Sequence, residues 1–345
     1  HKTGWVPAFE KIIRENDLKF VGFEADHVSV SQLEIFEDAF DTALIPTQNI
    51  VEKIREVKDE GEIQTIREAC RISDAAFLHI LDFIKPGVSE IQVANELDFY
   101  MRGLGATGVS FDTIVASGVR SSMPHGVASA KVIETGDLVT LDFGCYYNGY
   151  VSDMTRTIAV GELTAEEKKL YTKVLKGHLD LLHAKFLYGT TGNNLDILAR
   201  NPLWNDCIDY QCGTGHGVGH VLAVHEGPHG IRWGMPANGK AVVLQEGMVV
   251  TNEPGVYMPH KLGIRIENEM IVQKEEKNFY GQFLSFEDIT YVPYDRDAID
   301  TQYLSDEEID WINAYHKMIW EKIGPLLSGK EKSFLKKATG KITRA

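Results

Sequence analysis

The segment LVTLDFGCYYNGYVSDMTRT, residues 138–157, predicts a β-hairpin. Its Asn148-Gly149 pair is the strongest short signal for a two-residue type I′ turn, and a turn centred there places Asp142 opposite Thr155. Asp153 then lies one pair further along on the same face, about 7 to 8 Å from Asp142 at the backbone. Two carboxylates at this separation can share bound ions. The alternative, that both aspartates are solvent-exposed, is disfavoured because aspartate is depleted in strands flanked by Val, Leu and Phe.

A glycine-rich segment, CGTGHGVGHVLAVHEGPH at residues 212–229, carries four of the 12 histidines of the chain. Histidine is the commonest metal ligand and the usual acid or base near neutral pH, and glycines let the backbone approach a ligand closely. A phosphate-binding loop is the competing interpretation, but the segment lacks the GxxxxGK pattern of such loops. Imidazoles held only by backbone partners are plausible for His220 and His229 taken singly, and implausible for all four histidines together.

Three further acidic residues lie on predicted strands. The segment GIRIENEMIV at residues 263–272 alternates, so Arg265, Glu267 and Glu269 face one layer and the apolar residues face the other. A polar outer face would explain Glu269 and, taken alone, Glu267. It does not explain Glu253, which follows an apolar run and directly precedes a proline.

Asp142, Asp153, one histidine of the glycine-rich segment, Glu253 and Glu267 form a set rich in oxygen with a single nitrogen. Hard or borderline divalent ions such as Mn²⁺ suit this set better than copper or a thiolate-bound zinc. Four carboxylates would balance the charge of two ions. Such a pair, about 3.5 to 4 Å apart, lowers the pKa of bound water and polarises a carbonyl.

The composition excludes several classes of protein. The chain has 345 residues, of which 43% are hydrophobic and 25% charged, as in an ordinary globular protein of one or two domains. The net charge of −15 disfavours nucleic acid as a partner. Four scattered cysteines give no disulfide framework, and neither a membrane span nor a secretion signal is evident. We therefore expect no membrane association and a cytoplasmic location.

The periodicity predicts an α+β layout in which helices pack on one face of a mostly antiparallel sheet. Three helix starts carry capping boxes, Ser89 with Gln92, Thr164 with Glu167 and Ser305 with Glu308. The predicted elements are, in chain order, a helix over 9–16, a strand over 20–23, a helix over 30–40, a long helix from 51 to a break at 85–87, a helix from 89, strands between 111 and 160, a helix over 164–186, strands between 210 and 295, and a helix over 305–323.

From about residue 50 to its end, the chain resembles the pita-bread metallopeptidases, which include methionine aminopeptidase, prolidase and aminopeptidase P. The resemblance rests on the motifs LDFG, SDMTRT, GTGHGVG, NEPGVY and GIRIENE. The segments VHEGP and SFEDITYVPYDRDAID, with the tail WINAYH at residues 311–316, are most similar to the Xaa-Pro aminopeptidase branch. The resemblance implies a pita-bread fold, which is a curved, mostly antiparallel sheet with helices on its outer face.

The resemblance also implies two divalent metal ions, most simply Mn²⁺. Five ligands would hold them: Asp142 on one ion, Asp153 and Glu267 bridging both, and His216 with Glu253 on the other.

The same resemblance implies catalytic or substrate-binding roles for four residues around the metals. His125 and His225 correspond to the substrate and transition-state histidines of the family, and Tyr257 and Arg265 are expected to bind substrate. An imidazole beside a metal-activated hydroxide can stabilise a tetrahedral oxyanion or shuttle a proton. Many relatives carry another histidine four residues before the ligand histidine; here that position is Cys212, which leaves its role open.

The implied function is hydrolysis of the N-terminal Xaa-Pro peptide bond by a metal-bridging hydroxide, on peptides with proline in the second position. The alternatives are a prolidase, which cleaves only Xaa-Pro dipeptides, and a non-catalytic binding module of the same fold. Residues 1–47 would be the C-terminal remnant of an N-terminal α/β domain, and residues 48–345 the catalytic domain.

A homodimer is a further expectation. Four side chains in the helix over 305–323 form a stripe that could pair two copies, although core packing is the commoner fate of such a stripe. They are Trp311, Tyr315, Ile319 and Trp320.

Overall fold

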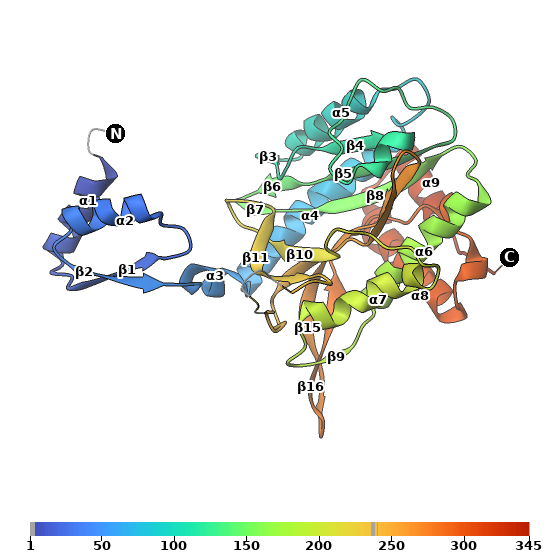
Figure 1. The fold of residues 1–345 in the computed structure, drawn as a ribbon. Coiled ribbons are helices and arrows are strands. Elements are labelled where there is room, and N and C mark those ends of the chain that lie inside the picture. The colour runs from blue at the N-terminus through green and yellow to red at the C-terminus, as the bar shows by residue number, and fades with distance from the viewer. Residues whose placement is uncertain (1–3, 236–238, 240, 345) are drawn as a thin grey trace. The chain divides into compact units, whose positions relative to one another are not determined.

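The computed structural model describes residues 4–235, 239 and 241–344. The chain divides into two compact units, His1–Arg55 and Glu56–Ala345 (Figure 1).

The first unit is a small α/β arrangement in which β1 and β2 pair in parallel. Its aromatic side chains, among them Trp5, Phe36 and Phe40, contact one another between α1 and α2. The predicted helix, strand and helix are confirmed, and a second strand follows them. The elements are α1 (Trp5–Glu15), β1 (Phe20–Glu24), α2 (Val30–Ala39), β2 (Ala43–Thr47) and α3 (Ile50–Arg55). That this unit is the remnant of a larger domain stays a prediction.

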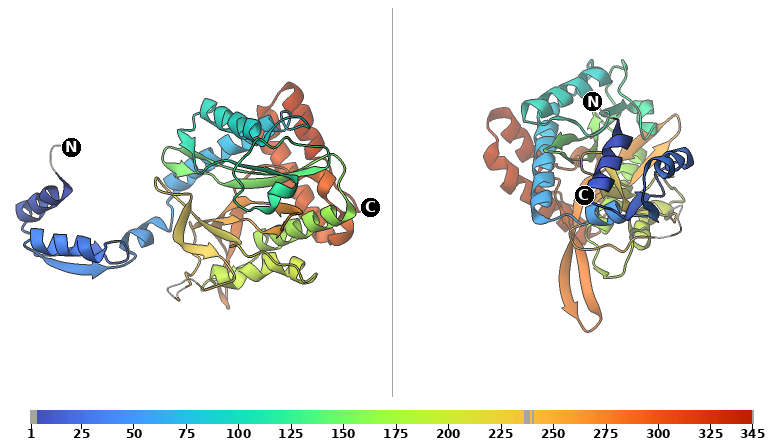
Figure 2. Two further views of the ribbon diagram at one scale, coloured as in Figure 1. Left: turned by 45° about the horizontal axis from the view of Figure 1, so that its top comes forward. Right: turned by 90° about the vertical axis from the view of Figure 1, so that its left-hand side faces the viewer.

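The second unit is an α+β assembly, and every strand pair described in it is antiparallel. Its α-helices are α4 (Glu60–Ile80), α5 (Glu90–Gly103), α6 (Ala165–Leu182), α7 (Gly192–Trp204), α8 (Asp306–Ile323) and α9 (Gly329–Ala338). The strands lie between the pair α4–α5 and the pair α6–α7 (Figure 2). None of the helices in the described part of the chain is both long and apolar enough to span a bilayer.

Two larger sheets carry the architecture. One has the order β4-β5-β8 and the other β11-β10-β12-β15-β16-β9. A bridge between Thr155 and Glu267 joins them. The strands are β3 (Gly108–Val109), β4 (Ile114–Ser117), β5 (Asp137–Phe143), β6 (Cys145–Tyr147), β7 (Tyr150–Val151), β8 (Met154–Val160), β9 (Phe186–Leu187), β10 (Gly215–Val218), β11 (His225–Ile231), β12 (Val249–Asn252), β13 (Gly255–Met258), β14 (Leu262–Arg265), β15 (Asn268–Asn278) and β16 (Gly281–Asp288).

The predicted hairpin is confirmed in its register. Asp142 of β5 faces Thr155 of β8, and Tyr147 faces Tyr150 at the tip. The turn residues Asn148 and Gly149 have φ of 49° and 87°, and a type I′ turn requires positive φ at both positions. The turn chemistry therefore sets which residues of the two strands meet.

The helices bury their apolar stripes against the sheets, and this packing forms the core. The pair α4–α5 contributes Phe77 and Leu97 to a cluster with Val139 and Leu141 of β5. Helices α6 and α8 pack against β14 in a second cluster, which includes Ile264. All three predicted capping boxes are present at the starts of α5, α6 and α8. The core thus fixes the strands from both sides.

Three features differ from the sequence-based expectation. The helix predicted from residue 51 is interrupted, because Asp59 and Glu62 form a capping box that starts α4 separately from α3. Helix α7, which contains Pro202, and helix α9 were not predicted. The strand predicted over 263–272 is two strands, β14 and β15, separated at Ile266 and Glu267.

The aromatic stripe of α8 mostly serves the core. Tyr315 and Ile319 are buried in the cluster formed with α6, and Trp311 and Trp320 are half-buried against it. This is the commoner fate of such a stripe. A homodimer through this helix stays a prediction. Less apolar surface is exposed on α8 than the sequence alone suggested, because Tyr315 and Ile319 are buried.

Candidate metal centre

The five predicted ligands converge on one pocket of about 130 Å³. Each comes from a different place in the sheets: Asp142 from β5, Asp153 from the residue before β8, His216 from β10, Glu253 from the residue after β12, and Glu267 from the gap between β14 and β15. They form overlapping groups whose ligand atoms lie within 4.8 Å of one another. These groups are Asp142–Asp153–Glu267, His216–Glu253–Glu267 and Asp153–His216–His225.

Thr155 holds Glu267 in place from the opposite sheet. The Thr155 hydroxyl donates to Glu267 Oε2 at 2.6 Å, and the Glu267 amide donates to the Thr155 carbonyl at 3.0 Å. The break between β14 and β15 therefore turns Glu267 toward Asp142 of β5 and Asp153, which directly precedes β8. Joining the two sheets is what assembles the acidic cluster.

The imidazole of His216 has a fixed orientation. Its Nδ1 lies 2.8 Å from the Gly217 carbonyl, so Nδ1 carries the proton and donates it there. The other ring nitrogen, Nε2, then faces Asp153 Oδ2 at 3.2 Å and Glu253 Oε1 at 3.6 Å. A backbone acceptor on the second ring nitrogen is typical of histidines that bind metals.

The glycines of this segment are required by close packing. A Cβ on Gly215 would lie 2.0 Å from the Thr251 carbonyl oxygen, and one on Gly217 would lie 2.0 Å from the Glu226 carbonyl oxygen. The neighbouring strands thus approach β10 more closely than any side chain would allow.

The electrostatics of the cluster call for a cation. Burial, and then the negative charges of the neighbouring carboxylates, raise the pKa values of Asp153 and Glu267 well above their usual range; the largest of these charges is Asp142 for Asp153 and Asp153 for Glu267. Asp142 Oδ1 is buried and has no hydrogen-bond partner in the described structure. Oxygen-rich buried groups with one imidazole are what hard or borderline divalent ions require, so the residues fit the expected ions.

Arg265 is the only Lys or Arg among the described residues that line the pocket, and it makes four hydrogen bonds. Its guanidinium donates to Asp142 Oδ2 at 2.5 Å, to the Tyr257 hydroxyl at 2.5 Å and to the Pro124 carbonyl at 3.1 Å, and its Nε lies 3.0 Å from the Thr155 hydroxyl. Only 3% of Arg265 is exposed. That Arg265 and Tyr257 bind substrate stays a prediction; in this structure they bind each other.

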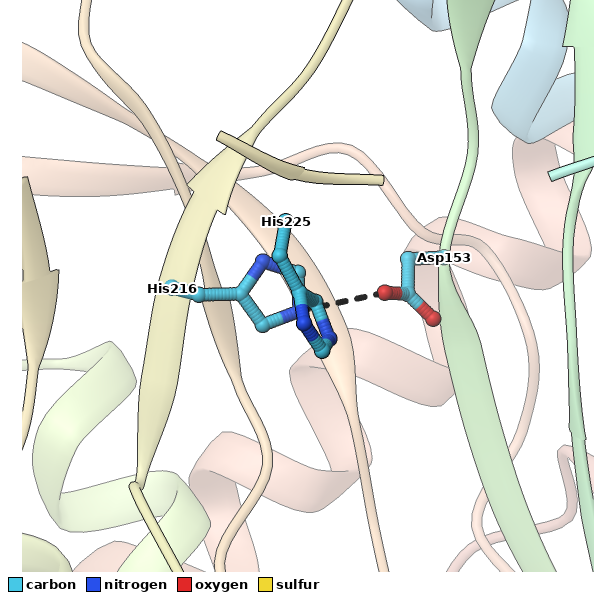
Figure 3. Close-up of side chains that lie close together, drawn as sticks. All are labelled: Asp153, His216 and His225. Atoms are coloured by element: carbon cyan, nitrogen blue, oxygen red, sulfur yellow. Dashed lines mark ion pairs between the residues drawn. The ribbon is translucent and has the colours of Figure 1, made fainter. Parts of the chain in front are cut away.

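The two predicted catalytic histidines lie at the open side of the pocket, and both are exposed. The ring of His225 lies 4.0 Å from that of His216, and the Asp153 carboxylate is directed toward them (Figure 3). Partial burial and the neighbouring His216 lower the pKa of His225. His125 lines the same pocket from the loop that follows β4.

The remaining histidines of the glycine-rich segment have structural partners. His229 is buried, and its Nε2 lies 3.0 Å from the Val249 carbonyl. His220 packs against the ring of Tyr150 at 4.3 Å. Cys212 lines the pocket, and burial raises the pKa of its thiol to about 11, so the thiol stays protonated at neutral pH.

Glu269 does not lie on a polar outer face, which is the position that alternation alone would explain. It is fully buried, and its Oε1 accepts a hydrogen bond of 2.5 Å from the Asp153 amide. Burial raises the pKa of Glu269 to about 8. The alternation predicted that Glu267 and Glu269 share one face, but the structure buries both residues instead of exposing them to water.

The comparisons with known proteins agree with this geometry. The model of metallopeptidase family M24 matches residues 64–274. The chain belongs to this family. The C-terminal region of peptidase M24 matches residues 282–342, and the creatinase/prolidase N-terminal domain matches residues 3–57. The expected pita-bread α+β fold is thereby confirmed.

Two M24-like relatives illustrate the range of similarity. An uncharacterized peptidase of Bacillus subtilis is 46% identical over 261 residues, which are 74% of this chain and 70% of that protein. Aminopeptidase P2 of Arabidopsis thaliana is 38% identical over 295 residues, which are 82% of this chain and 41% of that protein. The chain thus spans less than half of the plant enzyme.

Two solved M24 structures are similar in fold. The Xaa-Pro dipeptidase from Bacillus anthracis has a TM-score of 0.75 and 44% identity, with 86% of this chain and 79% of that chain covered. The X-prolyl aminopeptidase from Caenorhabditis elegans, a cytosolic enzyme with a di-nuclear active site, has a TM-score of 0.82 and 30% identity. That comparison covers 98% of this chain and 56% of the C. elegans chain.

Proposed function

We propose that the protein is a Xaa-Pro aminopeptidase of the aminopeptidase P type, which removes an N-terminal residue joined to proline by dinuclear metal-dependent hydrolysis. The observation that carries the proposal is the single pocket where four buried or half-buried carboxylates and His216 meet two exposed histidines. Relatives named aminopeptidase P and the di-nuclear C. elegans enzyme support the substrate class.

Two divalent ions, with Mn²⁺ as the proposed identity, would be held by the five predicted ligands. Asp153 and Glu267 would bridge them, with Asp142 on one ion and His216 and Glu253 on the other. When bound, such ions supply an activated water at neutral pH and polarise the scissile carbonyl. The −4 charge of the carboxylates would then be balanced.

The protein's own groups would then handle orientation and protons. Arg265, bonded to Asp142, keeps that carboxylate in one orientation and leaves Oδ1 for an ion. His225 and His125, at the open side of the pocket, would hydrogen-bond the carbonyl oxygen of the substrate as it gains charge, or pass a proton to the proline nitrogen as it leaves. The lowered pKa of His225 favours its neutral imidazole, which can donate a hydrogen bond from one ring nitrogen and accept one at the other.

Prolidase is the second candidate, supported by the similarity to the B. anthracis dipeptidase. A dipeptide places its terminal carboxylate beside the scissile bond, and binding it favours a nearby cation. Among the described residues that line the pocket, Arg265 is the only Lys or Arg, and Asp142 and Tyr257 already occupy it. This favours a substrate that continues beyond proline.

The test compares Ala-Pro-Ala with Ala-Pro as substrates of the Mn²⁺-loaded protein. A higher kcat/KM on the tripeptide supports the proposal, whereas cleavage of the dipeptide alone supports prolidase. Metal content after dialysis is the control for the non-catalytic alternative. A protein that neither retains a transition metal nor cleaves either peptide would be a binding module.

Three further proposals concern the origin of residues 1–47, the cellular compartment and the oligomeric state. Residues 1–47 are proposed to derive from a creatinase/prolidase-type N-terminal domain, which the match over 3–57 supports. The cytoplasm is the proposed compartment, by analogy with the cytosolic C. elegans enzyme. A homodimer is tested by light scattering of the chain, where a monomeric mass would exclude it.

A further inference from the structure

A buried ion pair lies next to the proposed catalytic histidine His225. Lys58 Nζ contacts Glu226 Oε1 at 2.8 Å, and the two side chains are only 1% and 12% exposed. Lys58 lies in the short segment between α3 and α4, and Glu226 directly follows His225 in β11. The pair therefore ties a distant part of the chain to the residue beside His225.

The other carboxylate oxygen of Glu226 closes the loop before His225. Glu226 Oε2 accepts a hydrogen bond of 3.0 Å from the His220 amide, and the Gly219 amide donates to the Val224 carbonyl at 3.0 Å. These two bonds join the start and end of the loop 219–225. Since Lys58 fixes Glu226, it also fixes the closure of this loop.

The same segment contacts the loop a second time. The Tyr150 hydroxyl donates to Glu62 Oε1 at 2.8 Å, and the Tyr150 ring packs on His220 at 4.3 Å. The segment 58–62 is itself anchored, because the Lys58 amide donates to the Gly247 carbonyl at 3.0 Å. Two contacts from one anchored segment thus hold the loop that ends at His225.

We propose that Lys58 is a positioning residue for His225, acting through its ion pair with Glu226. This rests on the proposed function, because it assumes that His225 acts on the substrate. A buried lysine is costly unless paired, so its burial here needs a compensating contact. Exact placement of a catalytic group can offset this cost, because a displacement of about 1 Å can lower the rate about 10²-fold.

The central experiment is a double-mutant cycle on the Mn²⁺-loaded chain. Lys58→Met is expected to lower kcat on Ala-Pro-Ala by about 10- to 100-fold, the usual effect of losing a group that orients an active-site residue, with KM changed little. In a His225→Ala background the same change should alter kcat by less than about 3-fold, because residues that act as a unit are not additive. An equal loss of kcat in both backgrounds would overturn the proposal.

Three variants act as controls. Lys58→Arg keeps the cation and should recover most of the lost kcat. Lys176→Met removes the ion pair to Glu308 between α6 and α8, remote from the pocket, and should leave kcat near that of the parent. If Lys58→Met folds poorly because the half-buried Glu226 carboxylate loses its cation, the double variant Lys58→Met/Glu226→Gln removes that charge and should still have low kcat. A normal kcat in this folded double variant would contradict the proposal.

Measuring the metal content distinguishes positioning of His225 from an effect of Lys58 on the metal ligands. The Lys58 ammonium also interacts with the charge of Glu269, which accepts the Asp153 amide. Lys58→Met should nevertheless keep as much Mn²⁺ after dialysis as the parent. Loss of metal would assign the effect to Asp153 and refute positioning of His225.

Hydrogen exchange tests the loop without reference to activity. The amides of Gly219 and His220 should exchange faster in Lys58→Met than in the parent and in Lys176→Met. Unchanged exchange would refute the proposal even if the rate fell. A parent that cleaves no Xaa-Pro peptide would refute the proposed function, and the exchange result would still decide whether Lys58 holds the loop.

Discussion

Glu90, the first residue of α5, should be essential for the loop that carries His125. Its carboxylate is fully buried and accepts five hydrogen bonds. Oε1 accepts from the amide and hydroxyl of Ser117 at 2.8 and 2.9 Å, and Oε2 accepts from Arg120 Nε at 2.9 Å. The amide and hydroxyl of Ser129 donate to Oε2 at 3.0 and 2.6 Å. Both ends of the loop around His125 therefore attach to one side chain.

The magnitude follows from the groups that Glu90→Ala would leave without an acceptor. The buried amide of Ser117 and the half-buried amide of Ser129 each lose a partner, at about 1 to 3 kcal/mol apiece. Arg120 is 31% exposed and can turn to water, so its contribution is small. The two amides together make the expected fall in the free energy of unfolding about 2 to 6 kcal/mol.

Urea denaturation followed by far-UV circular dichroism measures this loss. Glu96→Ala on the same helix is the matched control, since Glu96 pairs with His79 at 2.7 Å but both side chains are about one-third exposed. Its expected cost is about 0 to 1 kcal/mol. A Glu90→Ala variant no less stable than Glu96→Ala would refute the reasoning.

Three other predictions concern the metal centre and pH. Asp153→Ala and Glu267→Ala should each release both ions and abolish turnover; near-normal turnover with two ions by mass spectrometry would show that neither carboxylate bridges. His225→Ala should keep its metal and lose about 10² to 10⁴-fold in kcat, whereas loss of an ion would make His225 a ligand. Burial lowers the pKa of His316 to about 3 in the folded protein. Below about pH 6.5 this imidazole therefore binds a proton in the unfolded chain but stays neutral in the folded one. The free energy of unfolding should therefore fall by about 1.4 kcal/mol per unit between pH 6.5 and 4, relative to His316→Gln; parallel pH profiles would contradict this.

Local signals in the sequence were sufficient for the hairpin and for the candidate ligands. Asn148-Gly149 determines a turn type, the turn determines the register, and the register places Asp142 and Asp153 on one face. Capping boxes likewise determined the starts of α5, α6 and α8, because they involve residues three positions apart. Each of these features depends on neighbours in the chain, which a sequence displays directly.

The tertiary structure alone decided what lies against each face. Alternation placed Arg265, Glu267 and Glu269 together, but a period of two does not say whether water or protein covers that side. Packing between the sheets buried all three, paired Arg265 with Asp142 and directed Glu269 to the Asp153 amide. The Lys58–Glu226 pair spans 168 positions and leaves no periodic trace. Contacts between side chains so distant in sequence depend on how the sheets and helices pack together. The local periodicity of a single sequence contains no information about that packing.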